Sequence, residues 1–172
     1  MLSAKMLKAM NQQINAELYS AYLYLAASAL LEDLDLKGCA HWMRMQYREE
    51  LLHVDKFFDY IVDREGQVKL QQIEAPKIEA KTPLALFELA LAHERKISAL
   101  IGDLVDLAGK EHDHASAHFL QWFIGEQIEE EANASEIAKQ LKRIGGDNQG
   151  LFLLDRELAT RPMPALTPAA VA

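Results

Sequence analysis

The sequence predicts an all-α protein: an antiparallel four-helix bundle with a short fifth helix. Three observations support this fold class. Glycine and proline are scarce, with 8 and 5 in 172 residues, and they separate long segments of helical pattern. The long segments would each form a helix of roughly 30 residues, about 45 Å long, which is stable only when packed against other helices. Finally, one aperiodic segment in the middle of the chain is too long for a tight turn.

The first two helices should form a hairpin. We expect the first to run from about Ser3 to Leu34, where the sequence LEDLDLKG breaks the pattern. The second should start at about Lys37 and end at about Arg64, just before Gly66. The short break between them makes the two helices antiparallel neighbours.

A long crossover should follow. Residues 67–83, QVKLQQIEAPKIEAKTP, have no helical period, and their length suits a connection along the bundle. Thr82 and Pro83 then give a helix start signal, with Thr as the N-cap and Pro at the first helical position. We expect this third helix to end near Lys110. Short, long and short connections in this order predict two antiparallel hairpins joined by a crossover.

The fourth and fifth helices complete the chain. Asp113 offers an N-cap after the short turn EHDH, and the fourth helix should run to Arg143, before two glycines. The apolar segment GLFLLDREL predicts the short fifth helix. Residues 1–160 would therefore form one domain, and the proline-containing tail 161–172 is expected to be flexible.

Composition argues against several classes of partner. The chain has 18 basic and 26 acidic residues and a formal charge of -8, which argues against nucleic acid and favours cationic ligands. No segment reaches membrane-spanning length, and the N-terminus lacks the apolar run of a signal peptide. The single cysteine, Cys39, forms no disulfide framework and is interpreted as a small apolar residue. We therefore expect a cytoplasmic protein with no membrane partner.

The first helix is apolar on two sides. One stripe carries Glu17 and Tyr24 among apolar residues and suits the interior of the bundle. A helix that is apolar on two sides buries both, so we expect a neighbouring subunit and a homo-oligomer. The second stripe consists of Ile14, Leu18, Tyr22, Leu25 and Ala29.

Each long helix also carries a glutamate on its core-facing stripe, close to its midpoint. These residues are Glu17, Glu50, Glu94 and Glu130. His53 follows Glu50 by one turn on the same face, within the stretch YREELLHVDKFF. A lone glutamate on such a stripe is usually at its edge or paired with Lys or Arg. Because the midpoints of antiparallel helices lie at one level, however, these four acids should meet at one point.

The helical period directs the nearby basic side chains elsewhere; they are Arg44, Arg48, Lys56, Arg95 and Lys96. Four buried carboxylates without a counter-charge repel one another, so they are either protonated or bind cations. Two divalent ions balance four negative charges, and oxygen ligands with one imidazole suit iron or manganese. We therefore expect a dinuclear site bridged by Glu50. Glu17 and His53 would bind one metal, and Glu94 and Glu130 the other.

At these residues the chain closely resembles the bacterial ferritins, over about residues 1–160. The segments that carry the resemblance are NAELYSAYLYL, YREELLHVDKFF, LALAHERKI and FLQWFIGEQIEEE. The resemblance implies a ferritin-like four-helix bundle and a hollow shell of about 24 subunits. It also implies that a di-iron ferroxidase centre oxidises Fe(II) with O2 or H2O2, and that the shell stores ferric oxyhydroxide.

The resemblance further implies roles for single residues. The residues that match the family's di-iron centre are Glu17, Glu50, His53, Glu94 and Glu130. Gln127 matches a residue that hydrogen-bonds near the second iron. Tyr24 matches a tyrosine that can donate an electron, although a tyrosine there can also simply pack, with its hydroxyl bonded to a carboxylate. The acids that match a third iron site are Glu49, Glu126, Glu129 and Glu130; the alternative is a solvated acidic face.

Two positions depart from other members of the superfamily. The fourth helix has Gln127 and Glu130 where bacterioferritins and rubrerythrins repeat ExxH, so the two metal positions are unequal. Leu51 stands where bacterioferritins have a haem-binding methionine, so we expect no haem.

Two other functions remain open on the sequence alone. A ferritin-like di-iron oxidase or peroxidase would use the same centre without storing mineral. A helical interaction protein would bind no metal and would keep the buried acids protonated. Metal analysis distinguishes the second alternative, and particle size with iron loading distinguishes the first.

Overall fold

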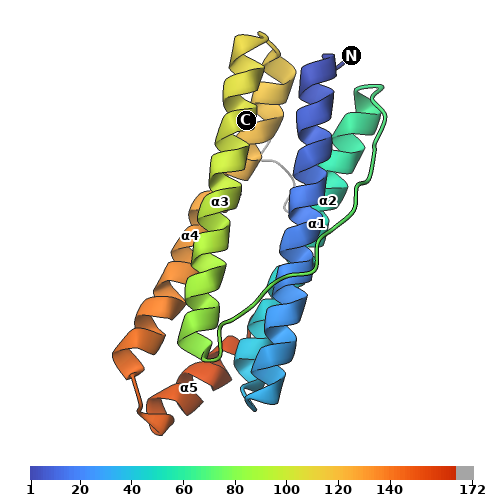
Figure 1. Ribbon diagram of the computed structural model, residues 1–172. Helices are drawn as coiled ribbons and strands as arrows, with labels where there is room; N and C mark the ends of the chain where they lie inside the picture. Colours follow the sequence, from blue (N-terminus) through green and yellow to red (C-terminus); the bar gives the residue numbers. More distant parts are fainter. Residues whose placement is uncertain (166–172) are drawn as a thin grey trace.

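The computed structural model describes residues 1–165, and this part of the chain forms α-helices and no strand (Figure 1). The helices are α1 (Ala4–Asp33), α2 (Lys37–Asp63), α3 (Pro83–Lys110), α4 (His114–Ile144) and α5 (Asn148–Leu158). The predicted all-α class is confirmed, and every expected helix is present within about one turn of its expected ends.

The helix starts follow from short polar side chains. Thr82 accepts a hydrogen bond from the backbone N–H of Ala85 at 3.2 Å, and Asp113 accepts one from Ser116 at 3.1 Å. Both were predicted as N-caps, and each satisfies a backbone donor that has no partner within its own helix. Ser3 caps α1 in the same way.

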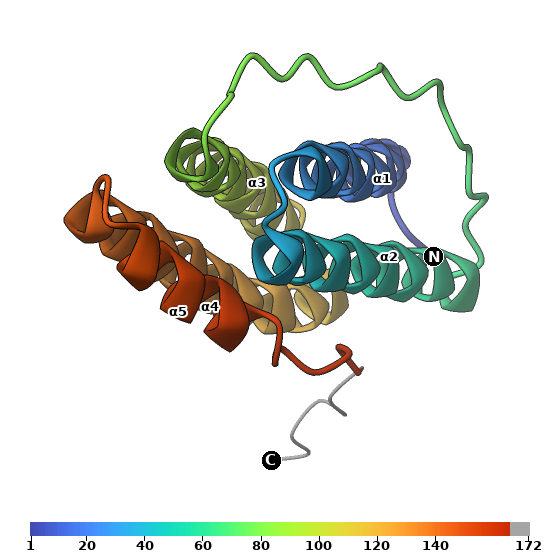
Figure 2. The ribbon, with the colours of Figure 1, turned by 90° about the horizontal axis from the view of Figure 1, so that it is seen from below.

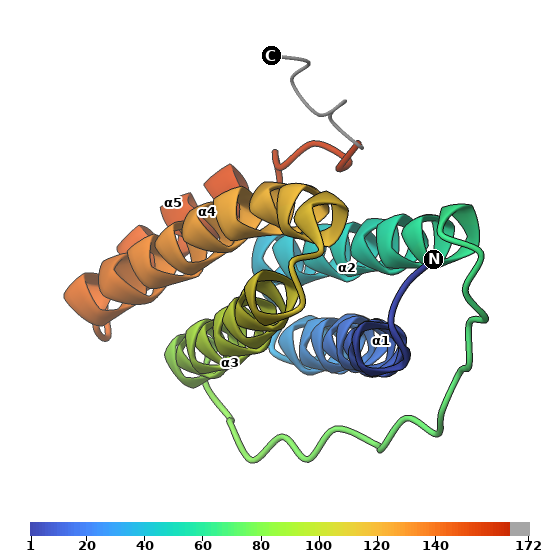
Figure 3. The ribbon, with the colours of Figure 1, turned by 90° about the horizontal axis from the view of Figure 1, so that it is seen from above.

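The helices form two antiparallel hairpins, α1 with α2 and α3 with α4 (Figure 1). Residues 64–82 connect α2 to α3 along the length of the bundle, as predicted. Seen along the bundle axis, this crossover lies on the side of α1 and α3 (Figure 2). The segment after α5 lies on the opposite side, next to α2 and α4 (Figure 3). Different segments of the chain therefore cover the two sides of the bundle.

The apolar core is divided into two clusters. One includes Leu31, Met43 and Phe87, together with the buried face of α5. The other includes Met10, Phe57 and Phe123 at the opposite end of the bundle. The level between them is occupied by buried polar side chains. Each end of the bundle is therefore stabilised by its own apolar cluster, and the level between them can accommodate polar side chains.

The second apolar stripe of α1 lies mostly at the surface of the single chain. Tyr22 is 45% exposed and Leu18 and Leu25 are partly buried, whereas Ile14 belongs to the core of its own chain. Except at Ile14, the stripe therefore lies at or near the surface of the single chain, as the prediction of a second apolar face requires.

Two further expectations concern the ends of the chain and the membrane. In the range 1–165, no helix combines the length and the hydropathy needed to span a bilayer. Arg161, the first residue of the tail that is expected to be flexible, makes contacts with α2. Residues 166–172 of the predicted tail lie outside the described residues.

Gly38 lets α5 approach the first turn of α2 closely. A Cβ atom at position 38 would lie 1.6 Å from the backbone oxygen of Asp155. We therefore expect Gly38→Ala to displace α5 and to destabilise the chain by about 1–3 kcal/mol. Thermal unfolding measures this effect.

Gly125→Ala provides the matched control, because an added Cβ there meets no atom within 4 Å. Alanine is a better helix former than glycine, so this variant should unfold at or above the wild-type temperature. Equal effects of the two substitutions would contradict the packing described for α5.

Candidate metal centre

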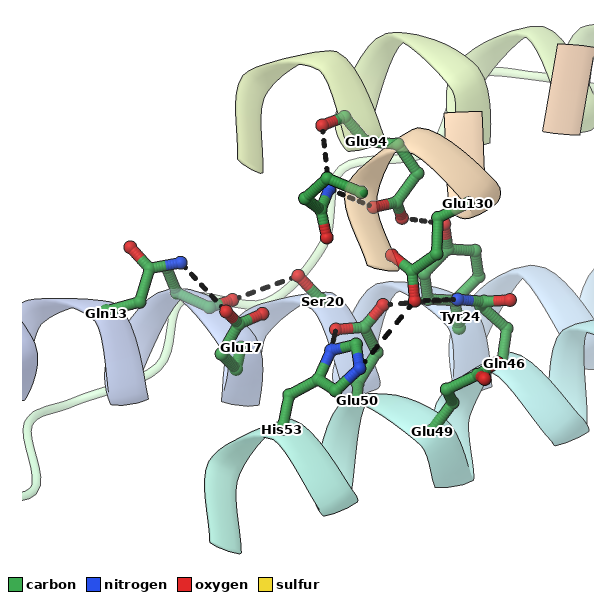
Figure 4. A network of polar contacts seen from close by, with 12 residues as sticks. Gln13, Glu17, Ser20, Tyr24, Gln46, Glu49, Glu50, His53, Glu94 and Glu130 are labelled. Atoms are coloured by element: carbon green, nitrogen blue, oxygen red, sulfur yellow. Dashed lines mark hydrogen bonds and ion pairs between the residues drawn. The ribbon is translucent and has the colours of Figure 1, made fainter. Parts of the chain in front are cut away.

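A layer of buried polar side chains crosses the middle of the bundle (Figure 4). All four long helices contribute to it, because each carries polar residues at its midpoint on the face that packs inward. Its members are Gln13, Glu17, Ser20, Gln46, Glu50, His53, Glu94, Gln127 and Glu130. The predicted meeting of the four glutamates at one level is thus present.

Within the layer, five side chains form two overlapping groups of potential metal ligands. Glu17, Glu50 and His53 each offer one atom, and these atoms lie within 4.8 Å of one another. Glu50, Glu94 and Glu130 form a second such group with the same limit. Glu50 belongs to both groups. This is the arrangement that the sequence predicted, in which one carboxylate faces two adjacent positions.

In residues 1–165, no lysine or arginine forms an ion pair with the carboxylates of the layer. For Glu50 and Glu130, the ion pairs are with His53, whose Nδ1 lies 3.5 Å from Glu50 and whose Nε2 lies 3.9 Å from Glu130. Within the layer, three buried atoms have no hydrogen-bond partner in the described chain: Glu17 Oε2, His53 Nε2 and Glu130 Oε2. Buried atoms of this kind are normally satisfied. Cations held by the five side chains would satisfy all three, so the donor set fits a pair of metal ions.

Burial raises the pKa of three carboxyl groups of the layer and so favours their protonated forms when no cation is bound. Burial, and then repulsion from Glu50, raises the pKa of Glu17 to about 8. Burial and repulsion from Glu94 raise the pKa of Glu50 well above its ordinary value, and burial and repulsion from Glu50 raise that of Glu130. A cation that binds here therefore displaces protons.

Amide side chains orient the carboxylates. Gln13 Nε2 donates a hydrogen bond to Glu17 at 2.8 Å, and Gln127 Nε2 donates to Glu94 at 3.2 Å. Gln46 Nε2 donates to Glu130 at 3.0 Å. Sequence reasoning missed Gln46, although it lies one turn before Glu50 on the same helix face, which was the available signal.

Tyr24 is also part of the layer. Its side chain is buried, and its hydroxyl donates a hydrogen bond to Glu94. Burial and the nearby Glu94 carboxylate raise the pKa of Tyr24, so the phenol keeps its proton. The structure thus places Tyr24 directly against one of the candidate ligands.

The remaining predicted acids lie beside the layer. Glu49, Glu126 and Glu129 line a cavity of about 260 Å³, together with Glu130 and residues 161–164. Burial raises the pKa of Glu126, and repulsion from Glu49 and Glu129 adds to the shift. Glu49 is paired with the guanidinium of Arg161. The sequence did not predict this cation, because Arg161 follows the last helical pattern.

Residues 7–144 match the family described as a ferritin-like domain. A bacterial non-heme ferritin of Bacteroides fragilis (strain 638R) is 42% identical over 161 residues, which cover 94% of this chain and 100% of the relative. A bacterial non-heme ferritin of Staphylococcus saprophyticus is 40% identical over 161 residues, which cover 94% and 96%.

Solved structures agree with the sequence comparison. An open-pore ferritin from the hyperthermophilic archaeon Archaeoglobus fulgidus is 46% identical, with a TM-score of 0.93 and coverage of 94% of this chain and 100% of that chain. A closed form of the Archaeoglobus fulgidus ferritin, engineered by site-directed mutagenesis, has a TM-score of 0.94 at 46% identity and covers 95% and 100%. The resemblance seen in the sequence is therefore confirmed over nearly the whole chain.

The raised pKa of Glu17 predicts how the stability of the metal-free protein depends on pH. The native state holds a proton that the unfolded chain releases above its ordinary pKa of 4.5. The contribution of Glu17 to the free energy of unfolding is therefore fully present below pH 4.5 and is lost as the pH rises to about 8. In the presence of a metal chelator, the wild-type protein should lose more thermal stability than the Glu17→Gln variant when the pH rises from about 5.5 to about 8.

In the presence of a divalent cation, the effect of pH on thermal stability should have the opposite sign. Because the cation binds the ionised carboxylates, the stabilisation by Zn²⁺ should increase with pH in the wild type and be smaller in Glu17→Gln. Identical pH profiles for the two metal-free proteins would show that Glu17 does not hold its proton in the native state.

Proposed function

The chain belongs to the ferritin family, and we propose that it is an iron-storage ferritin with a ferroxidase centre in each subunit. Fe(II) is the substrate, and the ferric product is kept as oxyhydroxide inside a hollow homo-oligomer. The observation that carries this proposal is the pair of ligand groups that share Glu50. The unpartnered buried atoms of Glu17, His53 and Glu130 support it.

The shared carboxylate suits a two-electron reaction. Two Fe(II) ions held side by side through Glu50 each lose one electron, and one oxidant molecule receives both. With O2 and two protons the product is H2O2, and with H2O2 and two protons it is water. Carboxylates are hard ligands and stabilise Fe(III) more than Fe(II). The protein's own contribution is to hold the two ions together and to exclude solvent from the layer.

The two metal positions have different ligands, and this difference favours release of the ferric product towards one side of the centre. His53 is a ligand for one position only, while Gln127 is bonded to Glu94 at the other. Glu130 belongs to the second position and also lines the acidic cavity. We assign a third iron position to this cavity, with Glu49, Glu126, Glu129 and Glu130 as its ligands. An ion that leaves the pair then moves between carboxylates.

Assembly into about 24 subunits is part of the same proposal. The relatives named above are ferritins, and one is an open-pore form. The surface stripe of α1, with Tyr22 at its centre, offers a contact for a second copy of the chain. The free and buried Cys39 needs no oxidising compartment, which supports a cytoplasmic location.

Iron oxidation by variants of the shared and second-position ligands tests the proposal. Glu50→Ala and Glu130→Ala should assemble but oxidise Fe(II) about 100-fold more slowly than wild type, because each loses a ligand. Glu136→Ala is the matched control, since this exposed acid on α4 lies outside both ligand groups. The measurements are the absorbance of Fe(III) after aerobic addition of Fe(II), and sedimentation with iron analysis.

The outcomes separate the candidate functions. A large particle that retains iron supports storage. Fast oxidation in a small particle without retained iron would replace storage with a di-iron oxidase or peroxidase. Wild-type rates in Glu50→Ala would remove the assignment of the centre.

Tyr24 is proposed to donate an electron during oxidation, since its hydroxyl contacts Glu94 directly. Electron paramagnetic resonance of samples frozen during oxidation should show a tyrosyl radical in wild type and none in Tyr24→Phe. Both proteins should still bind two ions per chain. A wild-type sample without the radical would leave Tyr24 the role of holding Glu94 in place.

A further inference from the structure

The acidic cavity beside the metal centre is closed on one side by the segment that follows α5. Residues 161–164 lie over α2 and α4, on the side of the bundle opposite the crossover (Figures 2 and 3). The cavity continues directly from the metal centre, because Glu130 belongs to both. Glu130 Oε2 is buried and has no hydrogen-bond partner in residues 1–165. Whatever enters this cavity therefore meets the segment after α5.

Arg161 is the residue that fixes this segment. Its backbone oxygen lies 2.8 Å from Nε2 of His41. Its guanidinium lies 4.4 Å from the ring centroid of Trp42 and donates a hydrogen bond to the Trp42 backbone oxygen at 3.4 Å. The same group lies 2.5 Å from Oε2 of Glu49, one of the four acids of the cavity. With 18% of its side chain exposed, Arg161 is a positioned charge rather than a solvated one.

The position of Arg161 is set by the docking of α5. Asp155 of α5 accepts a hydrogen bond from the backbone N–H of Cys39 at 2.8 Å, and Gly38 allows the close approach of the two helices. α5 ends at Leu158, three residues before Arg161. The short connection after α5 therefore places the guanidinium of Arg161 next to Glu49.

We propose that Arg161 is a built-in counter-ion of the acidic cavity, which a metal ion must displace from Glu49 before it can bind there. This inference rests on the proposed function, because the ion in question is the one that leaves the di-iron pair. A guanidinium bonded to Oε2 of Glu49 uses one lone pair of that oxygen and places a positive charge directly beside any metal ion that binds there. An ion bound at the other oxygen of Glu49 would still meet a positive charge at close range. Arg161 therefore sets the affinity of the third position without touching the first two.

This role has a consequence for the order in which the positions fill. In residues 1–165, no lysine or arginine forms an ion pair with the ligands of the paired positions, whereas the cavity already contains the guanidinium of Arg161. Iron should therefore fill the pair first and enter the cavity only when the pair is occupied. Arg161 favours oxidation at the pair over direct binding in the cavity.

Calorimetric titration of the assembled, metal-free protein with Zn²⁺ tests the inference. Arg161→Gln should bind the third Zn²⁺ per chain about threefold to tenfold more tightly than wild type, because the competing charge is gone. The affinities of the first two ions should not change. Arg156→Gln is the matched control, since Arg156 is an exposed arginine of α5 that contacts Phe152 instead of the cavity.

A double substitution separates a direct competition from a general effect of charge. In a Glu49→Gln background, Arg161 loses the carboxylate with which it is paired, so under direct competition for Glu49 the addition of Arg161→Gln should leave the third affinity unchanged within about twofold. A third affinity equal to wild type in the single variant Arg161→Gln would overturn the inference. Failure of the wild type to bind even two ions would instead overturn the proposed function.

A measurement on the wild type keeps the inference testable if a variant fails to assemble. In crystals soaked with Zn²⁺, anomalous scattering locates the ions, and the guanidinium of Arg161 should have left Glu49 in subunits with an ion in the cavity. An ion bound there while Arg161 remains on Glu49 would overturn the inference.

Discussion

The structure depends on a layer of carboxylates buried in the middle of a hydrophobic bundle, where His53 is their basic partner and no lysine or arginine of residues 1–165 forms an ion pair with them. Glu17, Glu50 and Glu130 have raised pKa values because of burial and mutual repulsion. Such a layer opposes folding when it is charged and empty. It becomes favourable when cations supply the missing charge. The binding of iron and the stability of the bundle are therefore linked through the same side chains.

The length of the helices helps to offset the free-energy cost of burying this layer. Helices of about 30 residues extend well beyond the layer in both directions. Each end then has its own apolar cluster, one around Phe87 and one around Phe123. Amide side chains such as Gln13 and Gln46 complete the layer by holding the carboxylates in orientations that face one another.

The two faces of the bundle are covered by different segments of the chain. The crossover covers the side of α1 and α3, whereas the segment after α5 lies on the side of α2 and α4 (Figure 2). The acidic cavity lies on this second side, and Glu130 belongs both to its lining and to the candidate metal centre. The packing of α5 on α2, through Gly38 and Asp155, affects this cavity because it determines where Arg161 lies.

Sequence by itself determined the helices and the candidate ligands. Scarce glycine and proline, with the caps Thr82 and Asp113, define the helix ends because these are local effects of the backbone. The glutamates at the helix midpoints predict the centre because antiparallel helices bring their midpoints to one level. Only the tertiary structure decided which carboxylates Gln46 and Arg161 would contact. Gln46 reaches Glu130 across two helices, and Arg161 reaches Glu49 through the docking of α5, so neither contact has a periodic signal along the chain.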